Sequence, residues 1–328
     1  MAWTKYQKFL ALMMVVTGSI NSLSTKWADK MESKNSVGEV KKFVHPFLQA
    51  SAMFLGEMLC LLTFKIVYWI NRNEDNPQNT LIQGNQNFNP FILMPAAMFD
   101  LVATSIMYIG LNLTYVSSFQ MFRGSVIVFV ALLSSTVLVN VIIGLAIVGV
   151  TDALYQSDEA KGRNSLITGD LLIILAQVIT ACQMVYEEKY VSGLNIPALQ
   201  AVGWEGVFGF SVLSSLLVVF YWIPAPPHFD SNPRGTVEDV IDGLVQIGNN
   251  PLLLVAILGT VVSIAFFNFA GISVTKEMSA TTRMVLDSVR KAIMDRRQLP
   301  PGRKDKNVSS PIAVTTLRAM AGQLETIS

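Results

Sequence analysis

The sequence predicts an all-α protein whose helices cross a membrane several times, and three observations predict this fold class. Hydrophobic residues make up 52% of the 328 residues and charged residues 14%, whereas soluble domains carry about 25% charged residues. The hydrophobic residues form continuous blocks close to the ~20 residues that span a bilayer as a helix. The blocks do not alternate with polar residues, which argues against a membrane β-barrel.

Hydropathy places the membrane spans in order along the chain, and polar or Pro/Asn-rich connections separate most of them. The predicted spans are Tyr6–Leu23, Pro46–Ile70, Pro90–Leu113, Ser117–Leu138, Val141–Leu154, Gly169–Tyr190, Ala201–Ile223, Pro251–Ile272 and a ninth that begins near Ser279. The fourth and fifth spans form one almost continuous hydrophobic run. A single helix over residues 124–154 would be ~46 Å long, which exceeds a ~30 Å hydrocarbon core, and two helices would leave no room for a loop.

Two segments outside these spans are predicted to form an amphipathic helix and a polar tail. Thr236-Val-Glu-Asp239 has the pattern of a capping box, and hydrophobic residues follow it at helical spacing. We therefore expect a short amphipathic helix that lies on the membrane surface there. After Val289 the chain becomes too polar to cross a bilayer, so residues 291–328 are expected to form a disordered extramembrane tail.

The predicted helices repeat in the same order in the two halves of the chain. The second helix begins Leu48-Gln49-Ala50 and the seventh begins Leu199-Gln200-Ala201, while the third begins Asn89-Pro90 and the eighth begins Asn250-Pro251. The first and sixth helices also align without gaps. We expect a first repeat over residues 1–155, a linker over 156–168, a truncated second repeat over 169–290 and the polar tail over 291–328. If residues 124–154 form two helices, the second half enters the membrane from the opposite side and the repeats are inverted, as in many secondary transporters. If they form one helix, the two halves lie parallel.

Composition argues against several other classes of function. The net charge of +1 gives no indication of a nucleic-acid partner. The only cysteines, Cys60 and Cys182, lie in hydrophobic blocks, and the two histidines, His45 and His228, lie in polar connections. The sequence therefore predicts no metal site, no disulfide and no cofactor. An intramembrane enzyme is disfavoured because no His/Asp or paired-carboxylate motif recurs at catalytic spacing.

Two stretches of the chain carry a resemblance to a known family. They are Ser117-Ser-Phe-Gln-Met-Phe-Arg-Gly124 and Phe266-Phe-Asn-Phe-Ala-Gly-Ile-Ser-Val-Thr-Lys-Glu-Met-Ser-Ala-Thr-Thr-Arg-Met-Val-Leu-Asp-Ser288. Both resemble the F subfamily of solute carrier family 35, in the drug/metabolite transporter (EamA-like) superfamily, and the likeness extends from Met1 to about Val289.

This resemblance implies ten helices in a five-plus-five inverted repeat that works by alternating access. It implies a small-molecule solute, as in nucleotide-sugar transporters, and an intracellular membrane such as that of the Golgi, the lysosome or another endomembrane, with the mitochondrion as a further candidate. The sequence departs from this pattern at residues 137–142, where a hairpin and a full fifth helix are expected, and at 290–295, where a polar segment replaces the end of the ninth helix. We therefore expect about eight to nine helices.

Polar side chains inside the spans are the candidate solute-binding residues, because an ionisable group in a bilayer is costly and needs a reason. They are Gln120, Arg123, Asn268, Lys276 and Arg283. Arg123 with Gln120 on the same helical face, and Lys276 with Arg283 around a helix turn, suit an anionic group. Each also has a structural interpretation: Arg123 pairing with Asp100, Lys276 at a solvated turn, Asn268 bonding a neighbouring helix.

Four carboxylates are interpreted either as coupling groups or as structural charges. They are Glu57, Asp100, Glu205 and Asp287. Glu57 is expected to pair with Lys26 or Lys65, and Asp287 lies four residues after Arg283, so these two can form a pair along one helix. Glu205 has Gly203, Gly206 and Gly209 nearby, which permit close helix packing.

The favoured hypothesis is a secondary transporter of a small polar or anionic solute, with the lipid bilayer and the solute as its partners. The alternative is a non-transporting membrane adaptor that binds another membrane protein. No nucleic-acid partner is expected.

Overall fold

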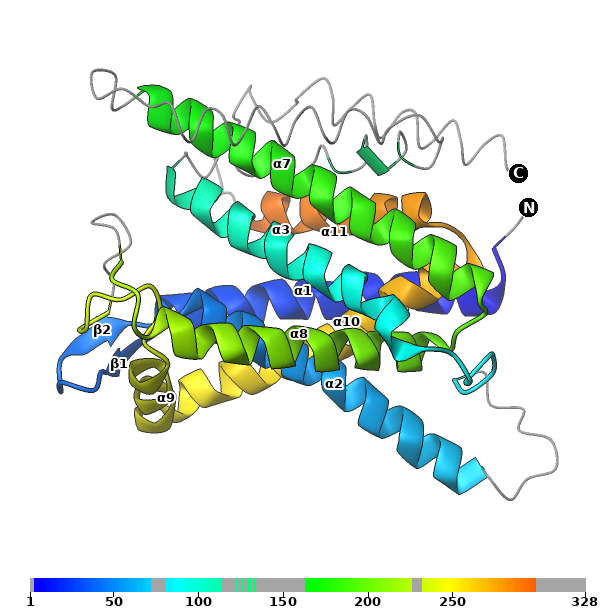
Figure 1. The fold of residues 1–328 in the computed structure, drawn as a ribbon, viewed down its shortest axis with the longest axis horizontal. Coiled ribbons are helices and arrows are strands. Elements are labelled where there is room, and N and C mark those ends of the chain that lie inside the picture. Colours follow the sequence, from blue (N-terminus) through cyan, green and yellow to red (C-terminus); the bar gives the residue numbers. More distant parts are fainter. Residues whose placement is uncertain are drawn as a thin grey trace.

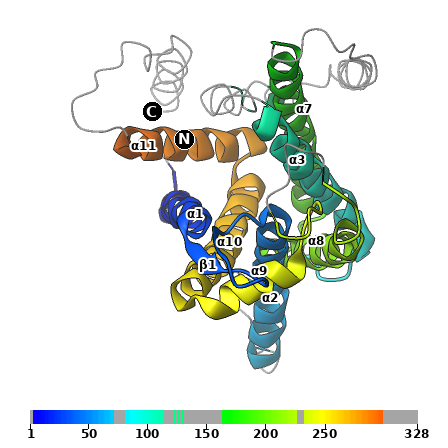
Figure 2. The same ribbon diagram turned by 90° about the vertical axis from the view of Figure 1, so that its left-hand side faces the viewer.

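The computed structural model describes residues 3–71, 81–113, 122, 126, 129–130, 133, 163–225 and 232–298, and these residues form a bundle of long helices (Figures 1 and 2). Its helices are α1 (Lys5–Lys30), α2 (Pro46–Ile70), η2 (Pro90–Leu93), α3 (Met94–Leu113), α7 (Arg163–Glu187), the π-helix η4 (Glu188–Ser192), α8 (Ala198–Phe220), α9 (Val240–Asn249), α10 (Pro251–Glu277) and α11 (Ala280–Gln298). Two short strands, β1 (Glu32–Lys34) and β2 (Val40–Lys42), pair as an antiparallel hairpin.

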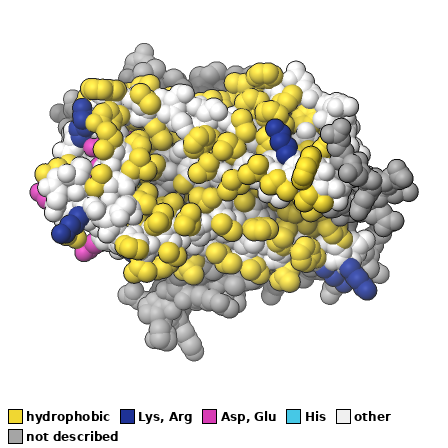
Figure 3. All heavy atoms as spheres, turned by 90° about the horizontal axis from the view of Figure 1, so that it is seen from below, with side chains coloured by type: hydrophobic (Ala, Val, Ile, Leu, Met, Phe, Trp, Pro, Cys, Tyr) yellow, Lys and Arg dark blue, Asp and Glu magenta, His cyan; other side chains and the backbone are white. Residues whose placement is uncertain are grey.

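The all-α polytopic fold is confirmed by the length and hydropathy of these helices. Within the described residues, five segments are long and hydrophobic enough to cross a membrane. They are Pro46–Ile70, Pro90–Gly110, Ile167–Ser192, Ala198–Phe220 and Pro251–Glu277. Seen from below, the bundle presents a face covered largely by hydrophobic side chains (Figure 3). The large hydrophobic side chains of Trp69, Trp222 and Leu252 are exposed. Contact with lipid is more favourable for such side chains than contact with water.

The repeated sequence motifs adopt the same local structure in both halves. Asn89 begins η2 and accepts a hydrogen bond from the Phe91 amide at 3.1 Å. Asn250 begins α10 and accepts one from the Leu252 amide at 3.0 Å. In both places proline occupies the first helical position, where its missing N–H leaves no backbone acceptor unbonded. Each Asn-Pro pair is therefore a helix N-cap.

The main helix contacts follow the repeat as well. Among the described helices, α2 packs on α8, α1 packs on α10, and α3 packs on α7. The sequence alignment makes α1 equivalent to α7, α2 to α8, and α3 to α10. Exchanging the two halves therefore turns each contact into another contact of the same set, as it does in two-fold symmetric assemblies.

The ends of the second half differ from the expected boundaries. Helix α7 begins at Arg163, inside the expected linker, and α11 continues to Gln298, past residue 290, where the second repeat was expected to end. In Figure 2, α11 lies across α1, which is seen end-on. Residues 134–162, which include most of the long hydrophobic run, and residues 299–328 lie outside the described part of the chain.

One end of the bundle is covered by the β1–β2 hairpin and α9 (Figure 1). The expected amphipathic helix is present, but the predicted capping box is wrong. The N-cap of α9 is Asp239, which accepts a hydrogen bond from the Asp242 amide at 3.0 Å. Glu238 instead turns away to meet His45 and the Phe47 amide, and the Thr236 hydroxyl has no hydrogen-bond partner in the described structure.

Helix α9 buries its polar side and exposes its hydrophobic side. Asp242 and Gln246 are buried, whereas Ile241 and Leu244 are exposed by 55% and 56%. A helix on a soluble protein has the opposite arrangement. This orientation suits contact between α9 and the membrane interface.

A buried polar cluster joins this cap to the start of α2. His45 Nδ1 lies 2.6 Å from Glu238 Oε1, and His45 Nε2 lies 3.4 Å from Asp242 Oδ2. Asp242 Oδ1 accepts from the amide and the hydroxyl of Ser36 at 2.6 and 2.7 Å. The connections of the two halves are therefore held together outside the membrane spans, an arrangement that hydropathy alone does not reveal.

The pH dependence of stability should report this cluster through Asp242. Burial raises the pKa of the Asp242 carboxyl, but hydrogen bonds from Ser36 and Gln246 and the charge of His45 outweigh burial, so the pKa lies below its ordinary value of 3.8. A carboxyl with a depressed folded-state pKa stabilises the fold above its unfolded pKa, and this contribution is lost as the pH falls through the folded pKa. Wild type should therefore melt higher than Asp242→Asn near neutral pH, and the difference should shrink as the pH falls below the ordinary carboxyl pKa of 3.8. A difference that persists at acid pH would contradict this account.

Candidate functional site

Ionisable side chains from both halves meet inside the bundle, where burial of a charge is costly unless it is paired. Four of them are at most 7% exposed: Glu57 on α2, Glu187 at the end of α7, Glu205 on α8 and Arg283 on α11. Asp100 on α3 is partly buried beside them. All five lie close enough for their charges to interact with one another. We call these five residues the central charge cluster.

Glu57 joins two helices through an amide rather than through a lysine. Its Oε1 accepts a hydrogen bond from Asn268 Nδ2 on α10 at 2.5 Å. The neighbouring Gly56 permits this approach, because a Cβ there would lie 2.9 Å from Ile264 Cγ2 of α10. The expectation that Glu57 pairs with Lys26 or Lys65 is therefore wrong, and Asn268 meets a carboxylate across a helix interface.

Arg283 makes an ion pair across the second half. Its Nη1 lies 2.5 Å from Glu187 Oε2, while Gln183 Nε2 donates to Glu187 Oε1 at 2.9 Å. Gly271 on α10 leaves room for the guanidinium, since a Cβ there would lie 2.7 Å from Arg283 Nε. That Nε has no hydrogen-bond partner within the described structure. Arg283 therefore pairs with Glu187 through Nη1, while its Nε remains available as a donor among the described residues.

Asp287 does not pair with Arg283 as the local spacing suggested. Both Nε and Nη2 of Arg290 donate to Asp287 Oδ1, at 2.9 and 2.6 Å. Arg290 Nη1 also donates to the Gly18 carbonyl and the Ser22 hydroxyl at 2.7 and 2.8 Å. This pair therefore fastens α11 to α1, and Asp287 has a structural contact.

Lys276 lies at the turn between α10 and α11, as expected. Its Nζ donates to the Ile196 carbonyl at 3.0 Å, in the connection that precedes α8. Ser279 begins α11 and accepts a hydrogen bond from the Thr282 amide at 3.1 Å. In this conformation the hydrogen bond from Lys276 stabilises the turn between α10 and α11. Gln120 and Arg123 lie outside the described residues.

Sequence reasoning missed two residues of this region. Glu187 stands beside Glu188 and Lys189 at the end of a predicted span, so it resembled a helix-end charge. In the structure α7 changes into the π-helix η4 at this point, a feature often found at functional sites. Arg290 was taken as the last residue of the second repeat, where the polar sequence begins, yet it is only 5% exposed.

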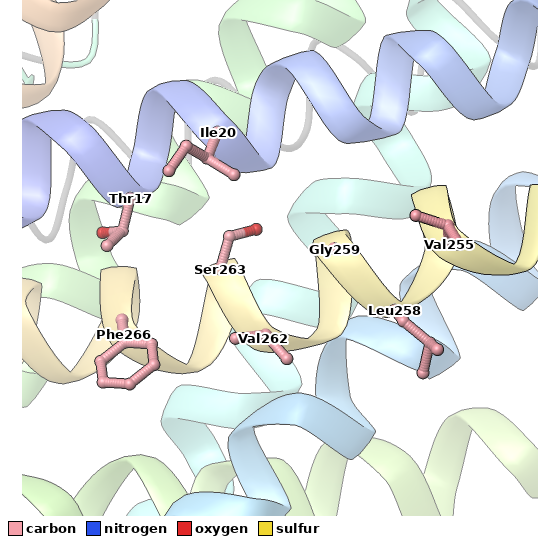
Figure 4. A pocket seen from close by; sticks show the side chains of 8 residues that line it. All are labelled: Thr17, Ile20, Val255, Leu258, Gly259, Val262, Ser263 and Phe266. Atoms are coloured by element: carbon pink, nitrogen blue, oxygen red, sulfur yellow. The ribbon is translucent and has the colours of Figure 1, made fainter. Parts of the chain in front are cut away.

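A groove on the outside of the bundle is distinct from the central charge cluster. It lies between α1 and α10, has a volume of about 440 Å³ and is lined mainly by hydrophobic side chains (Figure 4). Its two hydroxyls are occupied within their own helices, since Thr17 donates to the Met13 carbonyl and Ser263 to the Thr260 carbonyl. The groove offers hydrocarbon contact and no free hydrogen bond to a polar solute.

Relatives of the chain are found among named membrane carriers. The chain is 51% identical over 307 residues to the human protein "Solute carrier family 35 member F6", a match that covers 90% of this chain and 82% of that protein. The mouse protein of the same name is 49% identical over the same shares. The chain belongs to solute carrier family 35. Within the family, the names of these relatives support membership of the F subfamily.

More distant comparisons add little to this assignment. An uncharacterised protein of Schizosaccharomyces pombe is 30% identical over 295 residues, covering 86% of each chain. No family model matches the chain. A solved structure titled "Crystal structure of protein" covers 90% of this chain at 12% identity and a TM-score of 0.42, a likeness too low to carry an argument.

Membership of solute carrier family 35 makes the chain an integral membrane protein of a transporter family, and not an enzyme. The family assignment also agrees with the helix lengths and with the hydrophobic outer surface.

Proposed function

We propose that the chain is a secondary transporter that moves a small polar or anionic solute by alternating access between its two halves. The observation that carries this proposal is the central charge cluster, to which α2 and α3 of the first half and α7, α8 and α11 of the second half all contribute. Solute sites of repeat-built transporters lie at the interface between the repeats. Movement of one half against the other would change the environment of each residue in the cluster.

The solute-binding residues that we propose are Gln120, Arg123, Asn268, Lys276 and Arg283. Asn268 donates to Glu57 of the central charge cluster. Arg283 is a member of the cluster, and its Nε is a buried donor with no described partner. An anionic group could accept from this donor and compete with Glu187 for the guanidinium. A nucleotide or nucleotide sugar carries such a group, and we propose an intracellular membrane as the place of transport.

The alternative function is a membrane adaptor that binds another membrane protein without transport. The hydrophobic surface of Figure 3 and the groove of Figure 4 would serve such a partner. Lipid explains both features equally well, so the transporter is favoured. The two functions predict opposite results in a purified system.

Counterflow in liposomes containing the purified full chain tests the proposal. Vesicles loaded with unlabelled nucleoside monophosphates or nucleotide sugars should accumulate the labelled compound, at a rate well above that of empty vesicles. Asn268→Ala should reduce counterflow roughly tenfold, the effect expected from losing one or two hydrogen bonds to a buried solute. Asn87→Ala, which alters an exposed connection, should leave the rate unchanged. Liposomes that remain inert with every compound would support the adaptor.

A further inference from the structure

The central charge cluster contains more negative than positive groups. Among the described residues it has four carboxylates, Glu57, Asp100, Glu187 and Glu205, and one cation, Arg283. Arg283 forms its direct ion pair with Glu187. The described hydrogen bonds of Glu57 and Asp100 come from neutral donors, Asn268 and Thr104. The other three carboxylates form no direct ion pair among the described residues and share only the longer-range charge of Arg283, although a buried negative charge needs compensation.

Glu205 shows most directly that the cluster can take a further ligand. The side chain is 7% exposed, and its Oε1 has no hydrogen-bond partner in the part of the chain that the structure describes. Its charge interacts with those of all other members of the cluster. A buried acceptor without a donor has lost its hydrogen bonds to water and has gained none within the protein, which is unfavourable. A bound cation would satisfy this oxygen.

Three other cationic side chains that the structure describes on the surrounding helices are already engaged or face outward. Lys276 donates to a backbone carbonyl, and Arg290 is occupied by Asp287 and by α1. Lys65 on α2 is exposed. None of these three side chains is placed to neutralise Glu205.

We propose that Glu57, Asp100 and Glu205 form a binding site for a monovalent cation, a proton or an alkali metal ion. The proposal rests on the proposed transporter function and gives it a coupling partner. Glu57 and Asp100 belong to the first half and Glu205 to the second. A cation shared among them draws the two halves together, and its release leaves repulsion between like charges at the same interface. Cation binding thereby changes the balance between the two access states.

Cation binding can be measured on the purified full chain without any solute. Trp204 lies next to Glu205 and stacks on Phe208. The chain has five tryptophans, so the part of a fluorescence change that is lost in Trp204→Phe provides the local signal, and the melting temperature provides a global one. Na⁺ and K⁺ are titrated against N-methylglucamine at constant ionic strength, and in a separate series the pH is varied from about 8 to about 5. One of these cations should give a saturable response. A saturable response to Na⁺ or K⁺ identifies an alkali metal ion as the ligand, and a response to pH alone identifies a proton.

Substitutions assign the response to this site. Glu205→Gln removes the charge and keeps the shape, and it should weaken the apparent cation affinity roughly tenfold or more. The control Glu39→Gln alters an exposed carboxylate on the hairpin, paired with Lys41, and should respond as wild type. If Glu205→Gln elutes as aggregated protein, Glu57→Gln serves in its place. A response that is absent in wild type, or unchanged in both cluster variants, overturns the site.

The same measurements separate this inference from the transporter itself. Counterflow without any cation response would overturn the cation site and leave the transporter in place. A cation response in a protein that shows no counterflow would support the site and count against the transporter.

Discussion

Arg283→Met is expected to destabilise the protein by about 3–5 kcal/mol, because it leaves Glu187 as an uncompensated buried charge. Glu187 is 1% exposed and has Gln183 as its only other described hydrogen-bond donor. The double substitution Glu187→Met with Arg283→Met should be much closer to wild type, since two hydrophobic side chains of similar volume replace the whole pair. The free energy of unfolding in detergent, measured for wild type and the three variants, gives the coupling between the two residues.

The result that would contradict this account is additivity. If the double variant loses as much stability as the sum of the two single variants, Arg283 and Glu187 act independently. The 2.5 Å contact would then have no energetic meaning. Transport assays on the double variant would add a separate result, because a stable protein without the pair should lose the anion-binding donor of Arg283.

Gly206→Ala is expected to lower the melting temperature even though alanine favours helices over glycine. A Cβ at Gly206 would lie 2.6 Å from Glu57 Cβ and 2.7 Å from the Glu57 carbonyl carbon, where α8 packs on α2. Forcing atoms into such a contact costs about 1–3 kcal/mol, more than the ~0.5–1 kcal/mol gained from helix propensity. The loss should be larger for Gly206→Leu.

Gly248→Ala provides the matched control. Gly248 lies in α9, and a Cβ there would meet nothing within 4 Å. The same substitution should therefore raise stability slightly, by up to about 1 kcal/mol. Thermal melting of the two alanine variants should thus shift in opposite directions. Equal shifts would mean that α2 and α8 are not in the close contact that the structure shows.

The membrane helices were predictable because their signals are local. Helix α2 begins and ends where the hydropathy and Pro46 placed it, and the Asn-Pro pairs marked the starts of η2 and α10. The β1–β2 hairpin was missed because three-residue strands carry no readable alternation. It depends on Asp242, which binds Ser36 from 206 residues away.

Four of the five members of the central charge cluster were predictable from the sequence, but Glu187 was not. The cost of burying charge identified Glu57, Asp100, Glu205 and Arg283 from the sequence. Their partners were not predictable, because Arg283 meets Glu187 across 96 residues and Glu57 meets Asn268 across 211. Local spacing favoured the nearby Asp287 instead, and that choice was wrong.

The crosswise helix contacts have a consequence for biosynthesis. Helices α1, α2 and α3 leave the ribosome first, yet among the described helices their principal neighbours are α10, α8 and α7. The early segments must therefore reside in the bilayer with their charged and small residues unmatched until later segments insert. Assembly of this protein is then a late event, and premature termination would strand exposed carboxylates in lipid.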